Sequence, residues 1–309
     1  MGRRRKGEAV SGWICLDKPL DLGSTQAVGR VRRAFNAQKA GHAGTLDPLA
    51  TGVLPIALGE ATKTVPFLVE ADKAYRFTVA WGVETASFDR EGEVTAVSDA
   101  RPDSAAVAEA LAAFVGEIDQ IPPDFSAVKV DGRRAYDLAR EGAVMALKPR
   151  RVTIYEARVA GVAGPDSTDI EMSCGKGTYV RALVRDLATA LGVKAHVSAL
   201  RRTRVGPFTE ATATGLVVLE EMCHKGHALE VLLPVETALD DIPALAVTTE
   251  DAFRLTQGRS IVLLPRQVET LQARLSPSRI VSACYEKRIV ALCEMRAGRL
   301  NPTRVFHIS

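Results

Sequence analysis

The stretch GHAGTLDPLATG, residues 41–52, places three glycines and a proline around one carboxylate, that of Asp47. It lies between a predicted helix that ends near Phe35 and a predicted strand at residues 53–58. Asp47 precedes Pro48, and a residue before proline is pushed towards an extended backbone. A loop held in this way can present Asp47 into a cleft. The plainer interpretation is a carboxylate that caps a turn, and spacing alone favours it.

The rest of the chain predicts an α+β fold with a mixed sheet, because strand-like runs are adjacent and helices are irregularly interspersed. At residues 178–191, Val180, Leu183 and Leu187 recur at helical spacing, which predicts an amphipathic helix. The other predicted elements are strands at 12–16, 53–58, 73–84, 151–160 and 168–173, a strand and basic turn within 192–208, and helices from a Ser24–Thr25 cap to Phe35 and at 105–115.

Charge is unevenly distributed along the 309 residues, although the net charge is only +3. Residues 174–204 hold seven Lys and Arg against one Asp or Glu, whereas residues 209–250 hold one against eight. Basic faces favour a polyanionic partner, although surface cations that merely maintain solubility would give the same pattern. Five dispersed cysteines, without a secretory or membrane-length apolar run, predict a reduced, cytoplasmic protein that does not enter a membrane.

Recognisable motifs surround the Asp47 loop. GHAGTLDPLATG resembles the GHxGTLDPxATG signature of the TruB-type pseudouridine synthases, and the resemblance continues through VLPIALGEATK to residue 63. Asp21 stands where this family usually has glycine, which affects the expected turn but not the catalytic assignment. Further matching segments, in the family's order, are KAYR at 73–76, PPDFSAVKVDGRRAYDLAREG at 122–142, GKGTYVR at 175–181 and LRRTRVGP at 200–207. The resemblance covers about residues 12–208.

The resemblance implies an isomerase that converts the uridine at position 55, in the TΨC arm of tRNA, to pseudouridine. Such a reaction breaks the glycosidic C–N bond, rotates the freed uracil and joins C5 to the sugar. It involves no redox change and spends no phosphate, so we expect no cofactor and no metal. Asp47 is the implied catalytic carboxylate. Attack at C1′, attack at C6 and removal of a C2′ proton are all open routes.

The resemblance also assigns the partners of Asp47. Arg181 is expected to form an ion pair with it, because an adjacent guanidinium keeps a carboxylate ionised. Tyr75 is expected to stack on the target uracil. From the residues alone, Arg181 could equally be a solvated charge on a helix face, and Tyr75 a strand aromatic in the core.

Further residues are expected to bind the RNA. Tyr179 and Leu200 would line the pocket of the freed base, and His42 would contact nucleotides displaced by base flipping. The alternative for Tyr179 and Leu200 is ordinary packing, and the alternative for His42 is a turn residue that bonds to its own backbone. The candidate phosphate contacts, for which solvated surface is the alternative, are Lys18, Lys63, Lys129, Arg140, Lys176, Arg201 and Arg202.

The acidic, proline-containing stretch near residue 240 predicts a domain boundary. We expect a basic N-terminal tail at residues 1–10 and a pseudouridine synthase catalytic domain at 11–240, with an RNA-binding insertion at about 122–150. Residues 241–309 would form a small β-rich domain, whose position and charge resemble the family's PUA-like RNA-binding domain.

Two other functions are compatible with the pattern. One is an RNA-binding or RNA-folding protein whose catalysis is secondary or lost, although an intact set of Asp47, Tyr75 and Arg181 argues against complete loss. The other is a guide-RNA-dependent synthase of the same chemistry. The amino-acid sequence of the Asp47 loop and the insertion at 122–150 favour an enzyme that needs no guide RNA. We expect it to act as a monomer.

Overall fold

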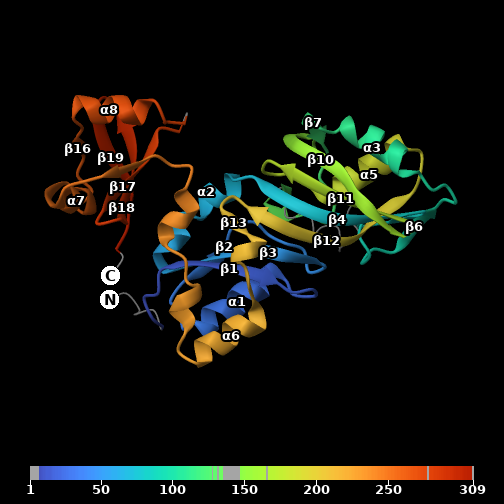
Figure 1. Ribbon diagram of the computed structural model, residues 1–309, viewed down its shortest axis with the longest axis horizontal. Coiled ribbons are helices and arrows are strands. Elements are labelled where there is room, and N and C mark those ends of the chain that lie inside the picture. Colours follow the sequence, from blue (N-terminus) through green and yellow to red (C-terminus); the bar gives the residue numbers. More distant parts are fainter. Residues whose placement is uncertain are drawn as a thin grey trace.

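The computed structural model describes residues 7–126, 128–130, 132–134, 147–164, 166–276 and 278–307, apart from the side chains of Lys129, Val130, Arg134 and Ala163. Its main feature is a large mixed sheet, and a smaller sheet follows near the C-terminus (Figure 1). This arrangement confirms the predicted α+β class with a small β-rich C-terminal domain. No helix within the described ranges is long and apolar enough to cross a membrane.

The strands of the large sheet run in the order β14–β1–β3–β12–β4–β11–β10–β7, with β2 paired to β3 and β13 to β12. The pairs β1–β14 and β3–β12 are parallel, and the other pairs are antiparallel. The strands are β1 (Gly12–Lys18), β2 (Ala40–His42), β3 (Ala50–Leu58), β4 (Lys73–Trp81), β7 (Gly116–Gln120), β10 (Arg150–Gly164), β11 (Ser167–Cys174), β12 (Ala195–Val205), β13 (Phe208–Thr209) and β14 (Thr214–Gly215).

Helices and short hairpins surround this sheet. The hairpins are β5 (Val83–Thr85) with β6 (Val94–Val97), and β8 (Lys129–Val130) with β9 (Arg133–Arg134). The α-helices are α1 (Ser24–Ala34), α2 (Val65–Glu70), α3 (Ser104–Ala112), α5 (Val180–Ala190), α6 (Leu216–His224), α7 (Thr249–Thr256) and α8 (Pro265–Gln272). The 3-10 helices are η1 (Gly59–Lys63), η2 (Glu210–Thr212), η3 (Ala228–Val231) and η4 (Val235–Leu239).

Two pairs of helices pack on different parts of the large sheet. α1 and α6 pack on β1 and β3, while α3 packs on β10 and α5 on β12. Leu200 contacts both apolar clusters, so β12 joins them. Helix α5 buries Val180, Leu183 and Leu187, which confirms the amphipathic face predicted from their spacing.

The start of α1 differs from the prediction in a way that matters for the Asp47 loop. Gly23 is the N-cap of the helix. The hydroxyl of Ser24 instead donates to the carbonyl of Leu46 and accepts from its N–H, each at 2.8 Å. Helix α1 therefore holds the residue before Asp47 in place. The loop is also shorter than predicted, because β3 begins at Ala50.

The smaller sheet has the order β15–β17–β18–β19–β16, from β15 (Ala244–Ala246), β16 (Ile261–Val262), β17 (Ile280–Tyr285), β18 (Arg288–Arg296) and β19 (Arg299–Val305). The sequence predicted only short strands here, so α7 and α8 are additions. This lobe is tied to η1, because Lys63 Nζ donates to the Val305 carbonyl at 2.7 Å and the His307 N–H donates to Glu60 Oε2 at 2.9 Å. The same ammonium lies 5.5 Å from the ring centroid of Phe306, which is buried in a cluster with Trp13.

Gly52 occupies a position in β3 that only glycine fits. Its φ is +98°, and a Cβ there would lie 2.2 Å from the carbonyl oxygen of Arg202 on β12. Gly52→Ala should strain this junction and lower the free energy of unfolding by about 2 kcal/mol. Urea unfolding followed by circular dichroism measures the change.

Gly41→Ala is the matched control for that substitution. Apart from its chain neighbours, no atom of the described residues lies within 4 Å of a Cβ built at Gly41, and its φ is not positive. Its free energy of unfolding should stay within about 0.5 kcal/mol of the wild-type value. Equal losses in the two variants would contradict the steric argument for Gly52.

Candidate active site

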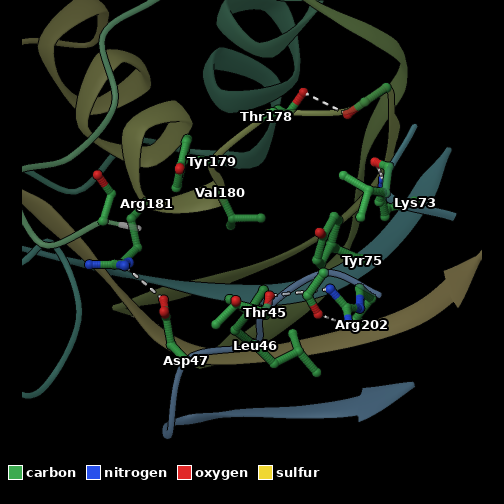
Figure 2. A pocket seen from close by; sticks show the side chains of 16 residues that line it. Thr45, Leu46, Asp47, Lys73, Tyr75, Thr178, Tyr179, Val180, Arg181 and Arg202 are labelled. Carbon is green, nitrogen blue, oxygen red and sulfur yellow. Dashed lines mark hydrogen bonds and ion pairs between the residues drawn. The ribbon is translucent and has the colours of Figure 1, made fainter. Parts of the chain in front are cut away.

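A pocket of about 260 Å³ lies between the Asp47 loop, β4, β12 and the start of α5 (Figure 2). This is near the size of the smaller ligand sites of proteins, which begin at roughly 300 Å³. Six residues that the sequence analysis selected line it: Asp47, Tyr75, Tyr179, Arg181, Leu200 and Arg202. Residues more than a hundred positions apart are therefore brought to one cavity.

Asp47 lies in a loop that is fixed through its backbone. The Pro48 carbonyl accepts hydrogen bonds from the Asp21 N–H at 3.0 Å and from Lys18 Nζ at 3.2 Å. The Ala50 N–H donates to the Asp47 carbonyl at 3.0 Å. Asp21 adopts a left-handed φ of +59°, a conformation that Asp tolerates better than most residues. The turn is thus formed despite the missing glycine, and the Asp47 side chain stays 42% exposed.

Arg181 links Asp47 to two other segments. Its side chain is 6% exposed. One terminal nitrogen donates to Asp47 Oδ2 at 2.7 Å and to the Phe125 carbonyl at 2.8 Å. The other donates to the Ser87 carbonyl at 3.1 Å and lies 3.4 Å from Asp89 Oδ2. The ion pair with Asp47 is present, and Arg181 is not the solvated helix-face charge that the residues alone allowed.

Asp89 is a residue of this network that the sequence analysis did not select. Ser87 Oγ donates to its Oδ1 at 2.5 Å, and the Glu91 N–H donates to the same oxygen at 3.0 Å. Asp89 is therefore fixed beside the terminal nitrogen of Arg181 that does not bond to Asp47. The segment around it has no periodicity or motif, so only its polarity could have drawn attention to it.

The two tyrosines are held by the sheet and by a side-chain clamp. Tyr75 lies on β4 directly opposite Arg202 of β12. Tyr179 is the N-cap of α5, and the amide of Gln120 accepts from its N–H at 2.8 Å and donates to its carbonyl at 3.2 Å. Burial raises the pKa of both phenols, so both are protonated at neutral pH.

Two predicted phosphate contacts are buried instead, so those predictions are wrong. Lys18 is 0% exposed and Arg202 is 1% exposed. Lys18 Nζ donates to the carbonyls of residues 19, 22 and 48. Arg202 donates to the carbonyls of residues 44, 45 and 53. Burial lowers the pKa of Lys18 to about 8 and also lowers the pKa of Arg202. Both cations hold the Asp47 loop and cannot reach a phosphate.

Lys73 is a third buried cation, and it lines the pocket. Its Nζ donates to the carbonyl of Val69 at 2.6 Å and to that of Ala71. It therefore caps the C-terminal end of α2. Burial lowers the pKa of Lys73 to about 8. KAYR was recognised as a motif, but only its tyrosine was selected as a site residue.

Of the other predicted RNA contacts, His42, Lys63 and Lys176 are not among the described residues that line the pocket, and Lys63 bonds to the Val305 carbonyl. His42 is half-buried on β2. Lys176 is exposed and pairs with Glu70. Lys129 belongs to β8, with its side chain outside the description, and Arg140 lies outside the described residues. Their roles stay predictions.

Arg201 is the neighbour of Arg202 but lies at the surface. Its two terminal nitrogens donate to the Asp17 carboxylate at 3.0 Å each, and its Nε donates to Glu210. Its side chain is 33% exposed. Two carboxylates thus compensate its charge, and contact with phosphate stays a prediction.

Comparison with known proteins gives consistent matches along the chain. Residues 32–180 match a family model described as TruB family pseudouridylate synthase (N terminal domain), and residues 181–240 match one described as tRNA pseudouridylate synthase B C-terminal domain. The chain is 68% identical to the tRNA pseudouridine synthase B of Caulobacter sp. (strain K31), over the full length of both. It is 50% identical to that of Nitrobacter winogradskyi, covering 99% of this chain and 85% of the relative.

Solved structures give a similar result. A chain of a Cbf5–Nop10–Gar1 complex superposes with a TM-score of 0.72 at 26% sequence identity, covering 96% of this chain and 85% of that chain. A chain of an H/ACA RNP bound to a substrate RNA, at 23% identity and the same TM-score, shares the fold.

Arg202→Met should remove the donor from three carbonyls around the Asp47 loop. We expect the free energy of unfolding to fall by about 3 kcal/mol, because buried acceptors that lose a charged donor are costly. Denaturant unfolding of the purified variant measures this loss.

Arg201→Met provides the adjacent control. Its ion pairs lie at the surface, where each contributes at most about 1 kcal/mol. If the Arg201 variant is destabilised as much as the Arg202 variant, the loop does not depend on the buried guanidinium.

Proposed function

The chain belongs to the TruB family of pseudouridylate synthases, and from that premise we propose that it isomerises the uridine at position 55 in the TΨC arm of tRNA to pseudouridine. The observation that carries the proposal is the Asp47 carboxylate, half-exposed to a pocket and bonded to the buried Arg181. Full-length relatives 67–68% identical, each named tRNA pseudouridine synthase B, support tRNA as the substrate.

The geometry of the pocket suits the chemistry. When the C1′–N1 bond breaks, the sugar becomes electron-poor, and a nearby carboxylate stabilises or captures it. Arg181 fixes the direction of Asp47 towards the cavity. Tyr75, Tyr179 and Leu200 give the cavity flat and apolar walls that can hold the flipped base while it rotates.

We further propose that the protein acts on bare tRNA as a cytoplasmic monomer, without a guide RNA or cofactor. Uridine and pseudouridine contain the same atoms in the same oxidation state, so the reaction consumes nothing. Lys176 and the basic C-terminal lobe, proposed as a PUA-like module, would contact the RNA backbone. His42 would contact nucleotides displaced by base flipping.

Incubation of the purified protein with unmodified tRNA transcript, followed by carbodiimide labelling and primer extension, tests the proposal. One stop that reports pseudouridine at position 55, without any added RNA or cofactor, is the expected result. Binding of the transcript without modification would instead favour the RNA-folding function, and a requirement for a second RNA would favour the guide-dependent one.

Asp47→Asn should abolish turnover and leave tRNA affinity within about tenfold of the wild type, because phosphate contacts supply most of the binding. Asparagine keeps the size of the side chain and an acceptor for Arg181. Single-turnover conversion and filter binding measure the two effects. Asp119→Asn, at an exposed carboxylate on β7, is the control and should be fully active. Useful turnover by the Asp47 variant would show that another group is the catalytic carboxylate.

Asp89→Asn should slow single-turnover conversion by roughly a hundredfold, because Arg181 would lose one of the groups that fix it and the Asp47 carboxylate would be less well oriented. Affinity for tRNA should not change. Glu91→Gln is the control, since its exposed side chain lies next to the network without bonding to Arg181, and its rate should stay within about twofold. Equal rates for the two variants would remove Asp89 from the positioning network.

A further inference from the structure

Two buried lysines near the pocket differ in one respect. Lys18 Nζ donates to three backbone carbonyls, which is the full capacity of an ammonium group. Lys73 Nζ donates to two, those of Val69 and Ala71. Among the described residues, Lys73 lines the pocket and Lys18 does not. No third partner of Lys73 Nζ is present in the described part of the chain, so one of its N–H groups is available to a molecule in the pocket.

Lys73 is also placed where a bound base would lie. It is two residues before Tyr75 on β4, so both side chains point from the same face of the strand, about 6.6 Å apart along it. Figure 2 shows Lys73 and Tyr75 at one end of the pocket and Asp47 with Arg181 at the other. A nucleotide with its sugar at Asp47 and its base on Tyr75 would present the edge of the base to Lys73.

We propose that Lys73 is a catalytic residue whose ammonium donates a hydrogen bond to a carbonyl oxygen of the target uracil and stabilises the negative charge that the base carries after the C1′–N1 bond breaks. The proposal rests on the proposed function. It assigns a base-binding role to a residue that otherwise only caps α2.

The rotation of the base makes one donor sufficient for both halves of the reaction. Breaking the C1′–N1 bond leaves its electron pair on the uracil, where the charge spreads over N1, O2 and O4. Rotation by half a turn about the N3–C6 axis brings C5 to the position of N1 and exchanges O2 with O4. The C5–C1′ bond then forms, C5 loses its proton, and N1 gains one. A donor that binds one carbonyl before the rotation binds the other carbonyl after it.

The same contact favours uracil over cytosine. An ammonium group only donates hydrogen bonds. Uracil presents an oxygen acceptor at C4, where cytosine presents an amino group. Lys73 faces the C4 substituent either before or after the rotation, and at that stage a cytosine would place donor against donor. A buried donor left without a partner is costly. Lys73 therefore contributes to selection of the base as well as to its departure.

The surroundings of Lys73 are consistent with a cation at neutral pH. Burial, and after it the charge of Arg202 on β12, lowers the pKa of Lys73 to about 8. Cys174 on β11 and the carboxylates of Asp72 and Glu70 act in the opposite direction. The ammonium form therefore predominates at pH 7. A partly desolvated cation acts more strongly on a nearby charge than a solvated one.

A substitution cycle between enzyme and substrate tests the contact. T-arm stem-loops carrying uridine, 2-thiouridine or 4-thiouridine at the target position are converted under single-turnover conditions by the wild type and by Lys73→Met. Sulfur accepts hydrogen bonds weakly, and its effect on the intrinsic chemistry cancels when two enzymes are compared. We expect the rate ratio of uridine to thiouridine to be roughly tenfold larger for the wild type than for the variant.

Lys18→Met is the matched control, since it removes another buried lysine, one that does not line the pocket. It should slow the reaction through the Asp47 loop but keep the wild-type ratios. Lys73→Gln, whose amide can still donate to the end of α2, replaces the methionine variant if that variant does not fold.

The outcomes separate this proposal from the function on which it rests. A ratio that changes in the Lys73 variant for either thiouridine, and not in the Lys18 variant, supports the contact. Ratios equal to those of the wild type, or the same change in both variants, overturn it. If the proposed function itself is wrong, the wild type does not convert the uridine stem-loop, and this is seen before any variants are compared.

Discussion

The site depends on the buried guanidinium of Arg202, because it bonds to three carbonyls in two segments of the chain. It donates to the carbonyls of residues 44 and 45 in the Asp47 loop and to that of Val53 in β3. Its own backbone is in register with Tyr75 on one side and with Gly52 on the other. The loop therefore begins and ends against one immobile side chain. The Ser24 hydroxyl adds a second fixed point next to Asp47.

Backbone carbonyls satisfy three of the cations buried around the pocket, whereas Arg181 pairs with carboxylates, and this difference has an electrostatic consequence. A carboxylate would cancel the charge of Lys18, Lys73 or Arg202, whereas carbonyl dipoles satisfy the N–H groups and leave the charge in place. The cost is visible in the lowered pKa of all three groups, which burial causes. In consequence, the charges of these cations remain close to the pocket, and Asp47 interacts electrostatically with both Lys18 and Arg202.

The sequence predicted the parts of this arrangement that are carried by local pattern or by motif. The α+β class, the amphipathic face of α5 and the loop around Asp47 belong to this group. Burial of Lys18 and Arg202 could not be predicted, because a lysine or arginine in sequence indicates surface, and only long-range pairing of β1, β3 and β12 reveals the carbonyls that surround them. Asp89 was not predicted as a site residue for the same reason, since it belongs to the site through its ion pair with Arg181, 92 positions later in the chain.

The polarity of the pocket agrees with the charge separation that the proposed reaction creates. Asp47, paired with Arg181, lies at one end, and the buried cations Lys73 and Arg202 lie at the other (Figure 2). Cleavage of the C1′–N1 bond makes the sugar positive and the base negative, so each end faces the charge that it stabilises. Groups already fixed by Arg181, Arg202 and the end of α2 need little reorganisation when that charge develops, and such preorganisation is commonly the largest electrostatic contribution to catalysis. The same bonds explain why the fold keeps these cations buried. If Lys18 or Arg202 moved into solvent, the loop that holds Asp47 would lose the hydrogen bonds that fix its carbonyls.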